Sequence, residues 1–85
     1  MTRKEALLDL FNIGKRSENV GMVLLVTKHK DYPEAELIAV PKENFELKAQ
    51  YIESAYTEDL VLSSCEDIEI LGVKVLDKTG GVIGG

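Results

Sequence analysis

Residues 20–27 restrict the fold of this chain more than any other segment. They read V-G-M-V-L-L-V-T and include five consecutive apolar residues. Successive side chains of a strand point to opposite faces, so this segment would be apolar on both sides. One face would carry Met22, Leu24 and Val26, and the other Val23 and Leu25. Both faces must then be covered, which is typical of a central strand.

Two amphipathic segments predict helices that pack on this strand. Thr2 and Glu5 form a capping-box pattern, which starts a helix over residues 3–13 with Gly14 just beyond its end. Residues 42–56 predict a second helix, because its apolar side chains recur at spacings of four, three and four. These side chains are Phe45, Ala49, Ile52 and Tyr56.

Two more apolar segments predict strands. Residues 36–40 follow a turn that contains Pro33 and form an antiparallel hairpin with the first strand. In residues 66–76 the alternation slips at Leu71-Gly72, which indicates a bulge. The second helix connects the second and third strands, and such a crossover normally joins parallel strands. If it carries the chain across the first strand, the sheet order is 2-1-3 and the first strand is antiparallel to both neighbours.

The predicted fold class is therefore α+β, as one small domain over residues 1–77. Its elements run helix, strand, strand, helix, strand, and its three-stranded, mainly antiparallel sheet packs with two helices. Residues 78–85 are rich in glycine, and we expect a flexible tail there.

Composition and charge limit the kinds of partner. The chain has 85 residues and a net charge of −5, and no apolar run approaches the length that a membrane span needs. Residues 1–32 carry six basic and four acidic side chains, and residues 33–85 carry four and eleven. This acidic balance disfavours direct binding of nucleic acid and favours protein partners. Without a signal-peptide pattern, we expect a cytoplasmic protein with no membrane association.

No pattern of residues predicts catalysis, a cofactor or a metal. Cys65 and His29 are the only residues of their kinds, and sequence does not show whether they are close. We interpret Cys65 as a buried or incidental thiol and His29 as part of a solvated hairpin end. The acidic side chains of residues 58–59 and 66–69 lack the spacing of a calcium-binding loop. We therefore expect a protein that is not an enzyme.

A self-associating surface is the main functional prediction. If both helices lie on one face of the sheet, the other face is bare, and a second copy would cover it as a homodimer. The bare face would carry either Val23 and Leu25 or Met22, Leu24 and Val26. If the helices take opposite faces, the monomer is self-sufficient. The candidate interface residues are Val23, Leu25, Tyr32, Tyr51 and Tyr56. A host protein is the other expected partner of such a binding or accessory protein.

Three further readings remain open. The chain ends in Gly84-Gly85, and its coarse order of elements over residues 20–76 resembles that of ubiquitin-like and sulfur-carrier proteins. That resemblance implies a terminal carboxylate that an activating enzyme adenylates. A small nucleic-acid-associated regulator is another alternative, and it would use basic side chains. These are Lys15, Arg16, Lys28 and Lys30.

The third reading rests on residues 48–60, K-A-Q-Y-I-E-S-A-Y-T-E-D-L, followed by I-E-I-L-G at 68–72. Residues 48–72 resemble a helix–strand ending of small uncharacterised phage and prophage proteins of Gram-positive bacteria. This resemblance implies a mobile-element origin and an accessory role, and it supplies no activity and no site residues.

Overall fold

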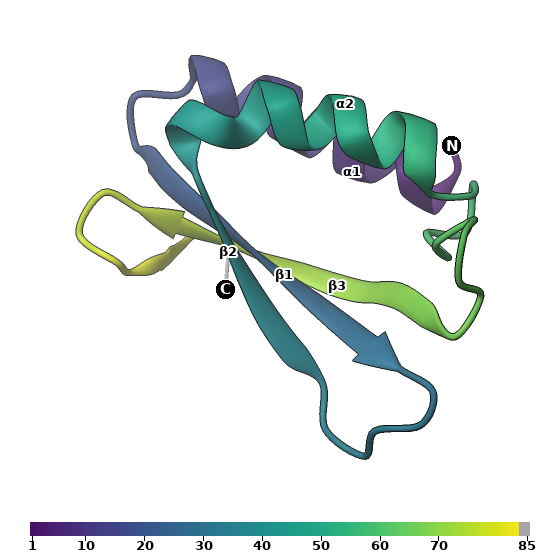
Figure 1. Ribbon diagram of the computed structural model, residues 1–85. Coiled ribbons are helices and arrows are strands. Elements are labelled where there is room, and N and C mark those ends of the chain that lie inside the picture. Colours follow the sequence, from purple (N-terminus) through teal and green to yellow (C-terminus); the bar gives the residue numbers. More distant parts are fainter. Residues whose placement is uncertain (84–85) are drawn as a thin grey trace.

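A computed structural model describes residues 1–83 as two helices above a strongly twisted sheet (Figure 1). The elements are α1 (Arg3–Arg16), β1 (Val20–His29), β2 (Glu36–Pro41), the short 3₁₀ helix η1 (Lys42–Asn44), α2 (Phe45–Ala55), β3 (Ile68–Asp77) and β4 (Val82–Ile83). The predicted α+β class and the order helix, strand, strand, helix, strand are confirmed for residues 1–77. Neither helix in the described residues is long and apolar enough to span a membrane.

The four strands form one sheet in the order β2-β1-β3-β4, and each neighbouring pair is antiparallel. The predicted order 2-1-3 is therefore confirmed, with β1 in the interior. The bulge is confirmed as well, because the β1–β3 register shifts where Gly72 pairs with Val26 and Ile70 with Thr27. Leu71 is the extra residue between these two pairs.

The chain after residue 77 differs from the predicted flexible tail. The Asp77 carboxylate accepts hydrogen bonds from the Thr79 hydroxyl at 2.7 Å and from the backbone N–H of Gly81 at 2.9 Å. This turn brings Val82 beside Leu76 of β3, so the sheet has a fourth strand. The turn depends on one carboxylate that organises the following residues, which the glycine-rich composition did not reveal. Gly84 and Gly85 lie outside the described residues.

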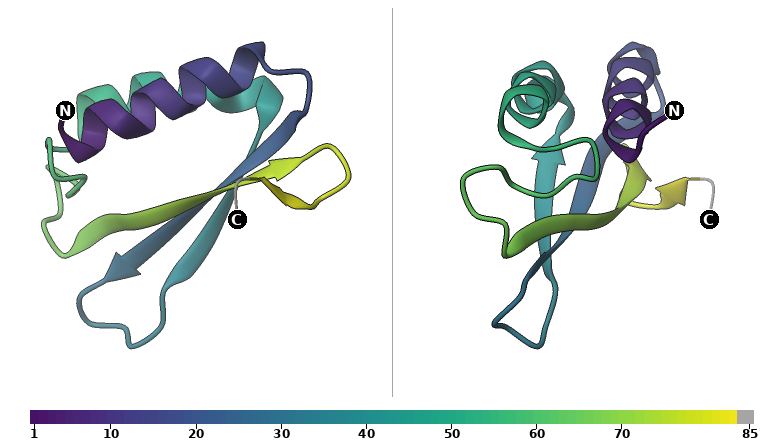
Figure 2. Two further views of the ribbon diagram at one scale, coloured as in Figure 1. Left: turned by 180° about the vertical axis from the view of Figure 1, so that it is seen from behind. Right: turned by 90° about the vertical axis from the view of Figure 1, so that its right-hand side faces the viewer.

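Both helices lie on the same face of the sheet (Figure 2). They are joined across their interface by Phe11 and Phe45, whose rings meet edge to face with centroids 5.2 Å apart. Gly14 lies beneath this pair, since a Cβ at that position would be 3.1 Å from Cε2 of Phe45. Gly14 is therefore an interior residue of α1, and the predicted helix end at Ile13 is wrong by three residues.

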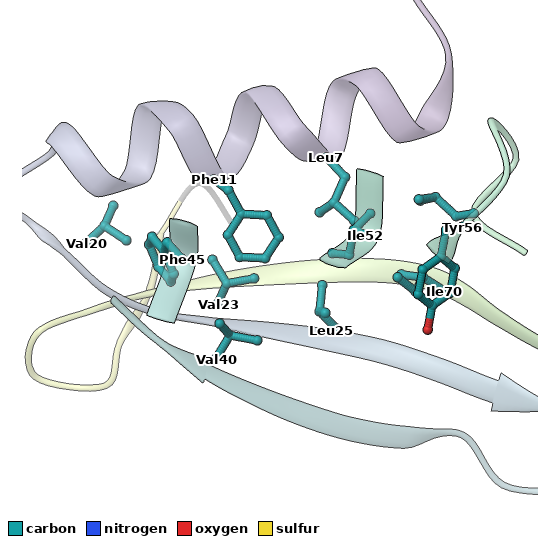
Figure 3. Packing of buried hydrophobic residues seen from close by; sticks show 11 residues of the cluster. Leu7, Phe11, Val20, Val23, Leu25, Val40, Phe45, Ile52, Tyr56 and Ile70 are labelled. Atoms are coloured by element: carbon teal, nitrogen blue, oxygen red, sulfur yellow. The ribbon is translucent and has the colours of Figure 1, made fainter. Parts of the chain in front are cut away.

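The core fills the space between the helices and the sheet (Figure 3). Its buried apolar residues come from both helices, from three strands and from the segment that follows α2. They are Leu7, Phe11, Val20, Val23, Leu25, Val40, Phe45, Ile52, Tyr56, Leu60 and Ile70. The core is thus one-sided, since it draws on only one of the two faces of β1.

The N-terminal turn of α1 ties the helices to the sheet. The predicted capping box is present, because Thr2 and Glu5 exchange hydrogen bonds. The Lys4 ammonium donates to two carbonyls at the C-terminal end of α2, those of Glu53 at 2.6 Å and Tyr56 at 2.9 Å. This contact links the start of α1 to the end of α2. The Arg3 guanidinium donates to the Ile70 carbonyl at 2.8 Å, next to the bulge in β3. These contacts hold α1 directly over the sheet.

Candidate functional site

One face of the sheet has no helix over it in the described part of the chain (Figure 2). Val23 and Leu25 of β1 point to the helices and are 0% and 1% exposed. The alternate residues Met22, Leu24 and Val26 point the other way and are only partly buried. Since β1 is the innermost apolar strand, its outward residues form the centre of an uncovered surface.

The neighbouring strands continue this surface, because residues paired directly across antiparallel strands share a face. We call this surface the open face. Its residues are Met22, Leu24 and Val26 of β1, Pro41, Ala39 and Leu37 of β2, Leu76, Lys74 and Gly72 of β3, and Val82 of β4. Lys74 is its only charged member. Leu37 and Val82 are 61% and 58% exposed, so apolar side chains meet solvent at both margins.

The two edges of the sheet differ in how they are covered. The first half of β3 is covered by residues 60–62, because the Ile70 N–H donates to the Leu60 carbonyl at 2.9 Å. The second half of β3 pairs with β4. Within residues 1–83, no strand pairs with the outer edge of β2. Ile38, Leu47 and Tyr51 line a shallow groove of about 500 Å³ between this edge and α2.

The structure corrects the choice of interface residues. Val23 and Leu25 were named as candidate interface residues, but they are core residues beneath the helices, and the bare face is the alternative one with Met22, Leu24 and Val26. Alternation alone separates the two faces and does not show which of them the helices select. Tyr56 is also a core residue, at 8% exposed. Tyr32 and Tyr51 are exposed, at 63% and 48%, and neither belongs to the open face.

Tyr51 and Tyr56 lie together at the end of α2, with ring centroids 6.1 Å apart. Burial raises the pKa of the Tyr56 phenol above its ordinary value of 10.0, and the neighbouring phenol of Tyr51 adds to this effect. Tyr51 also lies under the Lys48 ammonium, 5.1 Å from the ring centroid. Tyr56 is thus part of the core, whereas Tyr51 is half exposed on α2.

A second constellation joins residues that are far apart in sequence. The potential ligand atoms of His29, Cys65 and Asp67 all lie within 4.8 Å of one another. His29 ends β1 and pairs with Ile68 at the start of β3, which brings it beside the loop that precedes β3. Cys65 and His29 were interpreted as incidental residues. The sequence predicted that the strand ending at His29 pairs with the strand that follows Cys65. It did not predict the register, which decides whether their side chains are close.

The basic residues of the nucleic-acid hypothesis do not form one patch. Lys15 and Arg16 end α1, close to the start of β1, while Lys28 and Lys30 lie at its far end (Figure 1). At about 3.3 Å per residue, the strand separates the two pairs by roughly 25 Å. Lys28 is also engaged, since its ammonium donates to the carbonyls of His29 and Tyr32.

No family model, curated protein or solved structure matches this chain. The resemblances to phage and prophage proteins and to ubiquitin-like carriers therefore stay predictions. The two sites described above rest on their own geometry.

Proposed function

We propose that this protein is a small acidic interaction protein, not an enzyme, that forms a homodimer through its open face. The observation that carries the proposal is the placement of both helices on one side of a sheet whose other side is also apolar. Monomeric proteins rarely expose large contiguous apolar patches. The resemblance to phage and prophage proteins suggests the setting, which is an accessory protein of a mobile element.

A second copy fits this surface better than an acidic or basic partner. Among the residues of the open face, Lys74 is the one ionic side chain, and the next pair on the same side of the sheet, Lys28 and Glu69, carries opposite charges. A two-fold axis uses the same patch on both subunits, so no second complementary surface is required.

The packing geometry also suits two sheets. Face-to-face sheets lie about 10 Å apart and interdigitate apolar side chains of the kind that Leu24, Val26 and Leu37 present. Every strand of the open face has such a side chain, so the contact would span the sheet rather than one edge. The groove beside Leu47 lies between β2 and α2 and meets the open face at Ala39 and Pro41.

Analytical ultracentrifugation over a hundredfold dilution tests this proposal. We expect a species of twice the 9.4 kDa chain mass that dissociates on dilution. Leu37→Lys should raise the dissociation constant at least about tenfold, because it places a charge in the contact. Ile13→Lys is the matched control, since both side chains are 61% exposed but Ile13 belongs to α1.

Two results would reject the homodimer. One is a constant mass of 9.4 kDa at every concentration, which would leave the open face to a different partner, such as a host protein. The other is a dimer that Leu37→Lys leaves intact and Leu47→Lys dissociates, which would move the contact to the groove between β2 and α2.

A further inference from the structure

We propose that His29, Cys65 and Asp67 bind one Zn²⁺ ion at the end of the sheet where β1 meets the loop before β3. The inference is independent of the proposed homodimer, because none of the three residues belongs to the open face. It follows from three observations: the chemistry of the donor atoms, their distances, and the backbone hydrogen bonds that hold them.

The donor set selects a borderline transition metal. It combines one thiolate sulfur, one imidazole nitrogen and one carboxylate oxygen, which together are a typical ligand set for Zn²⁺. Mg²⁺ and Ca²⁺ prefer oxygen ligands and would leave the sulfur unused. The two anionic ligands, Cys65 and Asp67, would also balance the charge of a divalent cation. Three protein ligands leave a fourth tetrahedral position, which water would take.

The distances are close to those of a bound ion. Tetrahedral bonds of roughly 2.0–2.3 Å to Zn²⁺ place ligand atoms about 3.3–3.6 Å apart. The three donor atoms lie within 4.8 Å of one another, so the widest pair would have to close by up to about 1.5 Å. His29 and Cys65 are partly buried and Asp67 is exposed. The carboxylate can therefore swing onto an ion that enters from solvent.

Backbone hydrogen bonds fix the positions from which these side chains extend. Lys30, next to His29, donates its N–H to the Asp67 carbonyl at 2.8 Å. Ile68 donates to the Cys65 carbonyl at 3.1 Å, which closes a tight turn around Asp67. The loop is thus held to the end of β1 at Asp67 and closed on itself between Cys65 and Ile68.

Asp31 is placed to orient the imidazole. Its backbone N–H donates to Nδ1 of His29 at 3.1 Å, and its carboxylate oxygen lies 4.0 Å from the same nitrogen. In this arrangement Nδ1 accepts, so Nε2 carries the ring proton. Coordination through Nε2 would move that proton to Nδ1, and Nδ1 would then exchange the backbone N–H of Asp31 for its carboxylate as partner. Metal-bound histidines commonly donate their second nitrogen to a carboxylate in this way. Asp31 would act as a positioning residue and not as a ligand.

Cobalt and zinc titrations test the site directly, with the thiol kept reduced. We expect one ion per chain, and Co²⁺ should produce the near-ultraviolet absorption of a sulfur–cobalt bond. Cys65→Ser should remove that absorption, and His29→Gln and Asp67→Asn should each weaken binding of Zn²⁺ at least tenfold. Glu66→Gln is the matched control, because it removes a neighbouring carboxylate that is not part of the cluster, and it should bind as the natural sequence does.

A measurement on the unaltered chain guards against variants that fail to fold. Zn²⁺ should slow the alkylation of Cys65 by iodoacetamide, because a coordinated thiolate is less accessible. Absence of the sulfur–cobalt absorption, or equal affinity in Cys65→Ser and the unaltered protein, would overturn the proposal. So would a loss of affinity in Glu66→Gln as large as that in Asp67→Asn, since it would indicate general attraction to acidic side chains.

Discussion

Replacing Ile52 by alanine should test the one-sided core most sharply. Ile52 lies on α2, is 0% exposed and belongs to the cluster that joins the helices to the sheet (Figure 3). The substitution removes three carbon atoms, worth about 2.4 kcal/mol at roughly 0.8 kcal/mol each. The remaining cavity raises the cost to about 3–5 kcal/mol. Alanine's better helix propensity returns about half a kcal/mol.

The net expected loss is therefore about 2.5–4.5 kcal/mol, from a total stability of roughly 4–13 kcal/mol for a domain of this size. Urea unfolding followed by circular dichroism at one fixed protein concentration measures it, since association alters apparent stability. Ile13→Ala is the control: it is the same substitution in the other helix, at a residue 61% exposed, and should change stability by less than about 0.5 kcal/mol. Equal effects of the two substitutions would refute the assignment of the core to the inner faces of the helices.

Three further outcomes are expected. Gly21→Ala should lower the free energy of unfolding by about 1–3 kcal/mol, because the added Cβ would lie 2.9 Å from the Asp77 carbonyl oxygen. Gly72→Ala is the control and should not lose stability through a clash, because no atom lies within 4 Å of its added Cβ. Because folding raises the pKa of Tyr56, stability should be retained below pH 10.0 and fall as the pH rises above it, and Tyr56→Phe should reduce that fall in alkaline urea titrations. The Asp77 carboxylate accepts hydrogen bonds from the turn before β4, first from the Thr79 hydroxyl, and these bonds lower its pKa. Asp77→Ala removes these bonds, so it should speed amide hydrogen exchange in β4 while α2 stays protected. Unchanged exchange in β4 would contradict this role of the carboxylate.

Local patterns in the sequence were sufficient for the two helices and the three longer strands, but not for β4 or for the end of α1. The apolar run in residues 20–27 predicts an interior strand because two apolar faces need cover, and β1 is that strand. The capping box at Thr2 and the bulge near Gly72 are also local, since each depends on hydrogen bonds among neighbouring or paired residues. These features were correct because their causes lie within a few residues of one another.

The tertiary structure decided which face of the sheet the helices cover. Val23 and Leu24 are equally apolar neighbours, and no local rule distinguishes them. Phe11 packs against Phe45, so both helices lie on one face; Val23 points to that face and is buried, and Leu24 points to the open face. The choice is a property of long-range contacts, and the sequence could only present both alternatives.

The cluster of His29, Cys65 and Asp67 required the tertiary structure as well. Cys65 and Asp67 follow His29 by 36 and 38 residues, so the three do not form a recognisable sequence motif. They meet because the antiparallel register pairs His29 with Ile68 and the loop before β3 is held by hydrogen bonds. The sequence by itself determined that the chain forms a sheet around residues 20–27. Only the folded register, set by side-chain packing over the whole sheet, decided which polar side chains meet at its end.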